Sequence, residues 1–225
     1  MMKDSGTILI RLSPDTAEIS VEQEHNGIVS RKNLTPESLA LCFLGSRFDD
    51  TEHSTGLLPD HCIAATMTAS GIRYFIRYPR RRADISYYGT EYTDFPLPQL
   101  VFSMRYDPET HKAMDVRLCV VKDEHLTPDT PTYYYPFSNV YGDKRICLGN
   151  NALPQYKDPT RIGGLAYHIL HMPNNNDMYN TQHNKLGLDY RELLEYLKDK
   201  DPACYYSEIL VPDGKTLKHF IRGGK

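Results

Sequence analysis

Residues 135–149 of the chain read Tyr135-Pro136-Phe137-Ser138-Asn139-Val140-Tyr141-Gly142-Asp143-Lys144-Arg145-Ile146-Cys147-Leu148-Gly149. In this stretch an asparagine, Asn139, stands eight positions before a cysteine, Cys147. A thiolate can accept an acyl group and pass it on, and a nearby carboxamide can donate an N–H to the oxyanion that forms during the transfer. The spacing therefore predicts that Cys147 is a nucleophile and that Asn139 assists it.

The setting of Cys147 differs from that of the other cysteines. Gly142 and Asp143 precede it and Gly149 follows it, so its surroundings favour a loop over a periodic element. A free cysteine is more often a buried core residue, but the loop setting favours a functional thiol here. The five cysteines are odd in number, widely spaced and free of any C-x-x-C pair, which indicates neither a disulfide framework nor a zinc knuckle.

The stretch resembles the active-site segment of ubiquitin-conjugating enzymes, in which His-Pro-Asn is followed, after a short loop, by Gly-x-Ile-Cys-Leu. The chain keeps the family's distance from asparagine to cysteine. The matching positions are Asn139, Val140, Ile146, Cys147 and Leu148. Phe137 and Ser138 stand where the family has histidine and proline.

Residues 96–150 are similar to the bacterial branch of that superfamily called PRTRC system protein B, or prokaryotic ubiquitin-conjugating family D. A proline-rich lead at Pro96 enters a Leu-Val-Phe strand, a second strand follows, and Pro-Phe-x-Asn-Val and Ile-Cys-x-Gly-Asn come next. The resemblance implies that Cys147 accepts a ubiquitin-like modifier as a thioester and transfers it to an amine. It also implies that Asn139 stabilises the oxyanion or holds the loop in shape.

The same resemblance implies partners. They are a ubiquitin-like protein, an adenylating enzyme that activates it, and a JAB-type metalloprotease. The resemblance requires no cofactor.

The N-terminal residues predict a β-hairpin. Residues 7–12 and 17–22 alternate apolar and polar side chains, and Ser13–Thr16 supplies turn residues between them. We therefore assign residues 1–33 to an N-terminal β-hairpin extension and residues 34–225 to a ubiquitin-conjugating-enzyme-like domain. Thr35 followed by Pro36 predicts a short helix that ends near Leu44.

Further strands and helices follow the hairpin. Period-two alternation predicts strands at residues 72–78, 85–92, 100–104 and 114–120, and a short strand at residues 132–135 that leads into the cysteine loop. Helix starts occur at Asp158-Pro159 and at Asp189, where Glu192 completes a capping box. The predicted fold is α+β and ubiquitin-conjugating-enzyme-like, an antiparallel β-meander packed against helices.

Composition limits the kinds of partner. A formal charge of −3 and a pI near 6.3 give no electrostatic reason to expect nucleic acid. Arg80–Arg82 is interpreted as a solvated loop, with a docking surface as the alternative. No apolar run approaches the roughly 20 residues of a membrane span, and Met1–Ser5 lacks the apolar region of a signal peptide, so we expect a cytoplasmic protein.

Two other functions remain open. The first alternative is a catalytically silent module that binds a ubiquitin-like protein. The second is a cysteine hydrolase in which His168 or His171 acts as the base for Cys147. The second function needs an imidazole within hydrogen-bond reach of the sulfur. The tail from Arg222 to Lys225 resembles the Arg-Gly-Gly end of ubiquitin-like modifiers, and a flexible basic terminus is the alternative interpretation.

Overall fold

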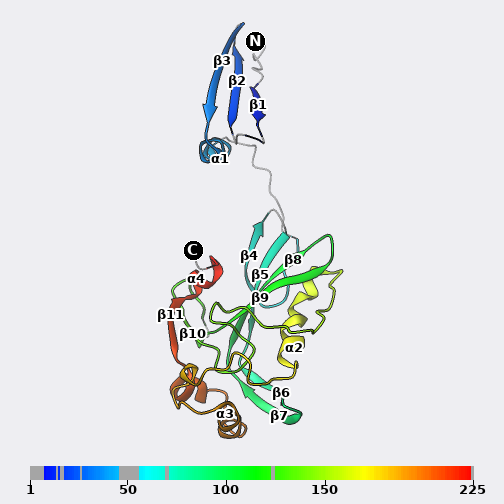
Figure 1. Ribbon diagram of the computed structural model, residues 1–225, viewed down its shortest axis with the longest axis vertical. Helices are drawn as coiled ribbons and strands as arrows, with labels where there is room; N and C mark the ends of the chain where they lie inside the picture. Colours follow the sequence, from blue (N-terminus) through cyan, green and yellow to red (C-terminus); the bar gives the residue numbers. More distant parts are fainter. Residues whose placement is uncertain are drawn as a thin grey trace. The chain divides into compact units, whose positions relative to one another are not determined.

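A computed structural model describes residues 8–13, 15, 18–25, 27–45, 56–68, 71–122 and 125–223. The chain divides into two compact units, Met1–Thr55 and Gly56–Lys225, which are drawn in Figure 1. Each unit is described by itself. The division proposed from the sequence, at residues 33 and 34, stays a prediction about domains, and the first compact unit extends beyond it.

The first unit contains an antiparallel sheet of three strands in the order β1-β2-β3. The strands are β1 (Ile8–Leu12), β2 (Ile19–His25) and β3 (Ile28–Leu34), and helix α1 (Pro36–Gly45) follows. The two predicted strands pair as expected, but the hairpin is extended by β3, which the sequence analysis missed. Its side chains are almost all exposed, so β3 carries no apolar alternation to reveal it.

The second unit contains a six-stranded sheet in which every neighbouring pair is antiparallel. In the order of the sheet the strands are β11 (Pro212–Thr216), β10 (Pro131–Tyr133), β9 (Lys112–Val120), β8 (Leu100–Asp107), β5 (Gly71–Tyr78) and β4 (Cys62–Thr68). The α+β class and the antiparallel meander are therefore confirmed. The edge strands β4 and β11 were not predicted.

A separate hairpin interrupts the meander between β5 and β8. Its strands, β6 (Arg81–Tyr87) and β7 (Thr90–Leu97), pair only with each other among the described strands. The expectation of one strand over residues 85–92 is wrong, because Tyr88 and Gly89 both have positive φ and form the two-residue turn. The predicted arginine loop is also shorter than expected, since Arg81 and Arg82 already belong to β6.

The helical elements of this unit are a 3-10 turn (Pro159–Gly163), α2 (Gly164–Leu170), a second 3-10 turn (Thr181–His183), α3 (Tyr190–Leu197), a π-helical turn (Tyr205–Ile209) and α4 (Leu217–Ile221). The two starts predicted from the sequence, at Asp158-Pro159 and at Asp189, are confirmed, whereas the turns at residues 181 and 205 and helix α4 were not predicted. Asp189 and Glu192 make both hydrogen bonds of the predicted capping box, at 2.8 and 3.1 Å. No helix among the described residues is long and apolar enough to cross a membrane.

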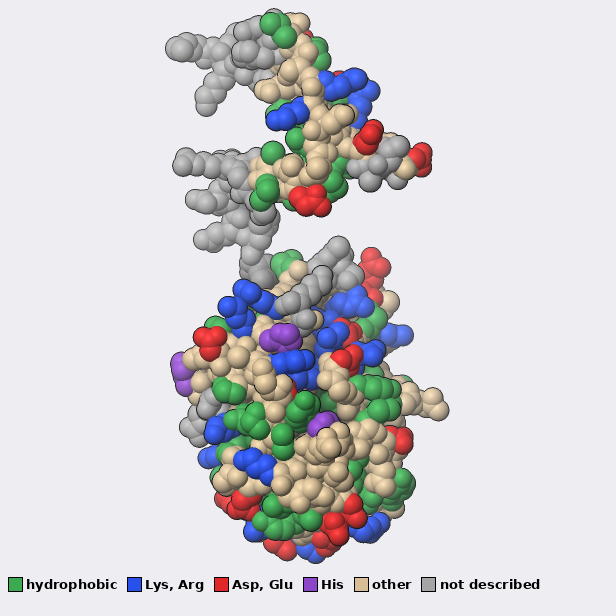
Figure 2. Space-filling model, turned by 60° about the vertical axis from the view of Figure 1, so that its left-hand side comes forward, with side chains coloured by type: hydrophobic (Ala, Val, Ile, Leu, Met, Phe, Trp, Pro, Cys, Tyr) green, Lys and Arg blue, Asp and Glu red, His purple; other side chains and the backbone are tan. Residues whose placement is uncertain are grey.

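Apolar side chains cover the sheet on both faces. The larger core packs α2 and α3 against one face through residues such as Leu118, Leu165 and Leu193. On the opposite face α4 places Leu217 and Phe220 against a smaller cluster that includes Cys119. Figure 1 shows α2 and α4 on the two sides of the sheet. Figure 2 shows that Lys and Arg side chains gather in the upper part of this unit on the face it displays.

Candidate functional site

A short β-hairpin brings Asn139 and Cys147 opposite each other. Val140 and Ile146 form an antiparallel bridge, and the backbone N–H of Cys147 donates to the carbonyl of Asn139 at 2.8 Å. The spacing of eight residues is thus the length of a hairpin whose first and last residues face one another. This geometry places the carboxamide and the thiol on neighbouring positions of one ladder.

The hairpin is attached to the central sheet. The N–H of Ile146 donates to the carbonyl of Val116 at 2.9 Å, and the N–H of Leu118 donates to the carbonyl of Lys144 at 2.9 Å. Strand β10 pairs with β9 only at its end, so this part of the β9 edge is occupied by the hairpin. The position of Cys147 is therefore tied to β9 by backbone hydrogen bonds.

A buried ion pair fixes the turn of the hairpin to the C-terminal strand. Lys144 has a positive φ of 71°, and its ammonium pairs with Asp213 of β11 and donates to the Thr132 hydroxyl at 3.0 Å. The Thr132 hydroxyl in turn donates to Asp213 at 2.8 Å. The side chains of Lys144 and Asp213 are only 14% and 2% exposed. Three segments distant in sequence therefore meet at one charge pair.

The ionisation of Asp213 follows from these contacts. Burial raises the pKa of this carboxyl. The hydrogen bond and the charge of Lys144, together with the hydrogen bond from the Thr132 hydroxyl, lower the pKa by a larger amount, so the pKa lies below its ordinary value. Asp213 is therefore ionised at neutral pH and balances the ammonium of Lys144.

Tyr141 is a functional candidate to which the sequence analysis gave no role. The interaction with the side chain of the half-buried Cys147 raises the pKa of Tyr141, so its hydroxyl stays protonated. A neutral phenol can donate a hydrogen bond to a sulfur atom. The guanidinium of Arg145 lies 5.5 Å from the centre of the Tyr141 ring and limits its position.

Asn139 adopts a conformation that suits its residue type. Its φ is 64°, in the left-handed region where asparagine is enriched. Its backbone N–H donates to the carbonyl of Asp177 at 2.9 Å, and its side-chain amide donates to the carbonyl of Pro173 at 3.4 Å. The asparagine therefore joins the hairpin to the loop after α2.

The two predicted site residues line the same small cavity. It has a volume of about 30 Å³, which is room for about one water molecule. Its remaining wall is largely apolar and includes Ile169 and Leu170 of α2. The tertiary structure thus brings Asn139 and Cys147 together over a closed apolar base.

Aromatic packing holds the segment that precedes Asn139. Phe137 is buried, and its ring centre lies 5.2 Å from that of Tyr135 and 6.0 Å from that of Phe95. Ser138 is also buried and donates to the side chain of Asn174 at 3.2 Å. At the positions where ubiquitin-conjugating enzymes carry histidine and proline, this chain therefore uses an apolar anchor and a hydroxyl.

The two helix histidines do not join the site. His168 is exposed, and Nδ1 of His171 lies 2.8 Å from the carbonyl oxygen of Tyr167. Neither lines the cavity beside Cys147. Over the described ranges no imidazole is hydrogen-bonded to this sulfur, and no group of three His, Cys, Asp or Glu residues could hold a metal ion. The cysteine-hydrolase interpretation thus lacks the base that it needs.

The other thiols of the second unit are poor nucleophiles. Burial raises the pKa of Cys119 to about 12 and that of Cys204 to about 11, and it also raises the pKa of Cys62. A thiol with a raised pKa is almost entirely protonated at neutral pH. Cys42, on α1 of the first unit, is exposed.

Replacing Asp213 by asparagine should destabilise the protein by about 3 kcal/mol at pH 7, because the ammonium of Lys144 loses its buried counter-ion. The pKa of Asp213 lies below its ordinary value of 3.8, so the pair's contribution is present above about pH 4 and is lost as the pH falls further. The measurement is thermal unfolding of both proteins from pH 7 to pH 3. Asp129→Asn, at an exposed carboxylate, is the control and should stay within about 0.5 kcal/mol of the parent. An equal effect of both substitutions would contradict this interpretation.

Replacing Tyr141 by phenylalanine should slow the alkylation of Cys147 by iodoacetamide at neutral pH roughly threefold, because the variant has no hydroxyl that could donate to the sulfur. Peptide mass spectrometry assigns the label to Cys147 rather than to the exposed Cys42. Tyr167→Phe, at an exposed tyrosine outside this cavity, is the matched control. An unchanged rate in Tyr141→Phe would show that the phenol does not assist the sulfur.

The comparison with protein families agrees with the resemblance read from the sequence. Residues 44–170, more than half of the chain, match the family described as prokaryotic E2 family D. The matched range includes strands β4 to β10, the hairpin with Asn139 and Cys147, and α2. No curated protein and no solved structure was found to match. The chain therefore belongs to prokaryotic E2 family D.

Proposed function

We propose that Cys147 accepts the C-terminus of a ubiquitin-like modifier as a thioester and transfers it to an amine. The observation that carries this proposal is the hairpin in which the thiol faces Asn139 while both are tied to the sheet and to the loop after α2. Membership in prokaryotic E2 family D supports the same chemistry. The activity is thus of the ubiquitin-conjugating, cysteine-thioester type.

The proposed reaction has two steps, transfer of the modifier to Cys147 and transfer from Cys147 to an amine. In the first, the Cys147 sulfur attacks the carbonyl carbon of a modifier held as a thioester on an adenylating enzyme, and the donor thiol leaves with a proton. In the second, an amine attacks the new thioester, a C–N bond forms, and the C–S bond to Cys147 breaks as the amine gives a proton to the departing thiolate. The first step exchanges one thioester for another, so it depends more on positioning than on a strong base.

Asn139 has the donors for a double role. A carboxamide carries two N–H groups, and one of them is engaged by the carbonyl of Pro173. The second N–H is proposed to stabilise the oxyanion that forms when the amine attacks. Loss of one such donor typically costs on the order of 100-fold to 1000-fold in rate. Tyr141 is proposed to support the thiolate that leaves in the second step.

The proposed partners are those of a ubiquitin-like pathway. A ubiquitin-like protein supplies the acyl group, an adenylating enzyme activates it, and a JAB-type metalloprotease removes it. The family membership supports such partners in general terms. The identity of each partner is part of the proposal.

A catalytically silent binding module is the second candidate. Phe137 and Ser138 replace the histidine and proline of ubiquitin-conjugating enzymes and are fixed by packing and by Asn174. Such a rigid segment is compatible with binding alone. The two candidates differ in whether the thiol carries the modifier.

Cys147→Ala should abolish formation of an adduct that is sensitive to reducing agent, whereas Cys147→Ser should form an oxyester that resists it, because only sulfur makes a thioester. The measurement is a non-reducing gel after mixing the protein with its modifier, the adenylating enzyme and ATP. Cys62→Ala and Cys204→Ala are the matched controls and should leave the adduct intact. A reducible adduct on Cys147→Ala would overturn the assignment.

Two substitutions at Asn139 separate its roles. Asn139→Gly keeps the left-handed backbone accessible but removes the amide, whereas Asn139→Ala removes the amide and also disfavours a φ of 64°. If the amide stabilises the oxyanion, both variants should discharge the thioester to free lysine about 100-fold more slowly than the parent. Single-turnover chase on a non-reducing gel measures the rate. Discharge by Asn139→Gly at the parental rate would leave Asn139 with a loop-forming role only.

A further inference from the structure

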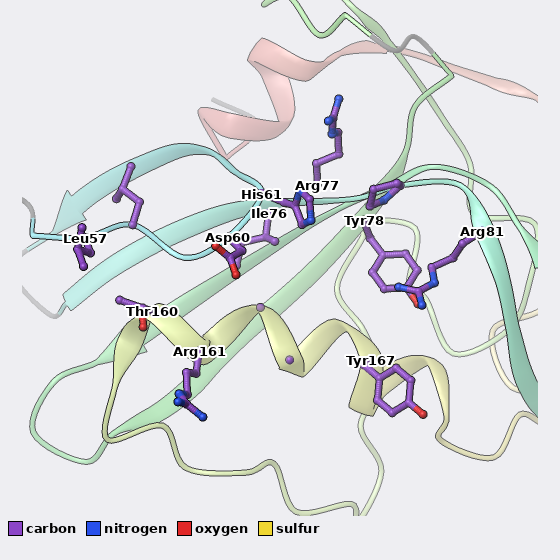
Figure 3. A pocket seen from close by; sticks show the side chains of 14 residues that line it. Leu57, Asp60, His61, Ile76, Arg77, Tyr78, Arg81, Thr160, Arg161 and Tyr167 are labelled. Atoms are coloured by element: carbon purple, nitrogen blue, oxygen red, sulfur yellow. The ribbon is translucent and has the colours of Figure 1, made fainter.

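A second and much larger cavity lies away from the thiol, between the end of β5 and the start of α2. Its volume is about 900 Å³. Figure 3 shows Tyr78 and Arg81 on its strand side and Arg161 and Tyr167 on its helix side, whereas the side chain of Arg77 points away from the helix. Cys147 and Asn139 do not line it. We call this cavity the arginine groove.

The arginine groove is basic within an acidic chain. The guanidinium groups of Arg81 and Arg161 and the imidazole of His61 line it, against the carboxylate of Asp60. The formal charge of the whole chain is −3, so the positive charge is a local feature. Such a cluster attracts carboxylates and raises the local concentration of anionic ligands.

The cations of the groove remain accessible. Arg161 is 85% exposed and lies 3.7 Å from Asp158, which is a weak solvated pair. The guanidinium of Arg81 stands 5.2 Å from the centre of the Tyr78 ring, and this contact leaves its N–H donors available at the ring edge. Both side chains can therefore accept a carboxylate without breaking a buried pair.

The hydroxyl of Tyr78 provides an independent indication of a ligand. Tyr78 is 8% exposed, and its hydroxyl is the buried side-chain polar atom without a hydrogen-bond partner in the part of the chain that the structure describes. Buried polar groups are nearly always paired, so an unpaired one calls for an explanation. A ligand seated in the groove would supply the missing partner.

Apolar side chains at the rim define the kind of ligand. Leu57 and Leu58 line the groove and are 84% and 45% exposed, and Tyr167 is 55% exposed. These surfaces gain from contact with apolar side chains, which a polynucleotide backbone does not offer. Alternating carboxylates and apolar side chains of an extended peptide fit both parts of the lining.

We propose that the arginine groove binds an extended acidic peptide segment of a partner protein, with its carboxylates on Arg81 and Arg161 and its apolar side chains on Leu57 and Leu58. A polar group of the peptide backbone pairs with the Tyr78 hydroxyl. The site is separate from the thiol, so peptide binding does not require Cys147.

The test uses the full chain and a fluorescein-labelled peptide that alternates glutamate and leucine, with fluorescence anisotropy as the measurement. Arg81→Glu and Arg161→Glu should each weaken binding at least about tenfold. Lys112→Glu makes the same charge change at an exposed position outside the groove and should leave the affinity unchanged. A peptide with glutamine in place of glutamate should bind at least about tenfold more weakly.

Tyr78→Phe adds a readout that separates binding from folding. It should weaken peptide binding about fivefold without lowering the thermal unfolding midpoint of the free protein, because the hydroxyl has no partner to lose. A lower midpoint with unchanged affinity would overturn the role of Tyr78. Equal binding of the glutamine peptide, or tighter binding of single-stranded oligouridylate than of the acidic peptide, would overturn the proposal as a whole.

Discussion

The hydrogen bonds that join the hairpin of residues 139–147 to β9 are the constraint on which the candidate site depends. They set the position of Cys147 through the backbone, so the thiol is not left to the freedom of a long loop. The ion pair of Lys144 and Asp213 then fastens the turn of this hairpin to β11. A thiol held in this way loses its positional freedom during folding, so it would lose little more on reaction.

The same logic explains the segment before Asn139. Phe137 lies among aromatic rings of the core, so Asn139 follows an anchored residue. Asn139 itself joins the loop after α2 through Pro173 and Asp177. A site that elsewhere in the superfamily relies on histidine and proline is assembled here from packing and amide contacts. The residues that hold the loop therefore differ from those of ubiquitin-conjugating enzymes, whereas the asparagine and the cysteine are the same.

Helix α2 contributes to two of the cavities of the second unit. Ile169 and Leu170 line the small cavity beside Cys147, whereas Gly164 and Tyr167 line the arginine groove. The two cavities differ in character, because one is small and largely apolar and the other is large and lined by Arg81 and Arg161. A short element that packs on the sheet can therefore present a chemical site at one end and a docking surface at the other.

Much of the fold followed from local patterns. Alternation of apolar and polar residues predicts strands β5, β8 and β9, and capping residues predict the helix starts at Asp158 and Asp189. Both signals act over only a few positions of the chain. Strand β3 escaped because its side chains are exposed, and β11 because its five residues include Pro212 and Gly214, which usually mark turns. Such segments become strands only when a partner strand lies beside them.

The sequence by itself determined the family and the pair Asn139 and Cys147, because a fixed spacing within one hairpin is a local property. Only the tertiary structure decided that Lys144 meets Asp213, that Tyr141 lies near the thiol, and that Arg81 and Arg161 line a groove beside α2. These contacts join segments far apart in the chain, and no local pattern encodes which distant side chain will be near. Their positions follow from how the sheet and helices pack, which is a property of the whole chain.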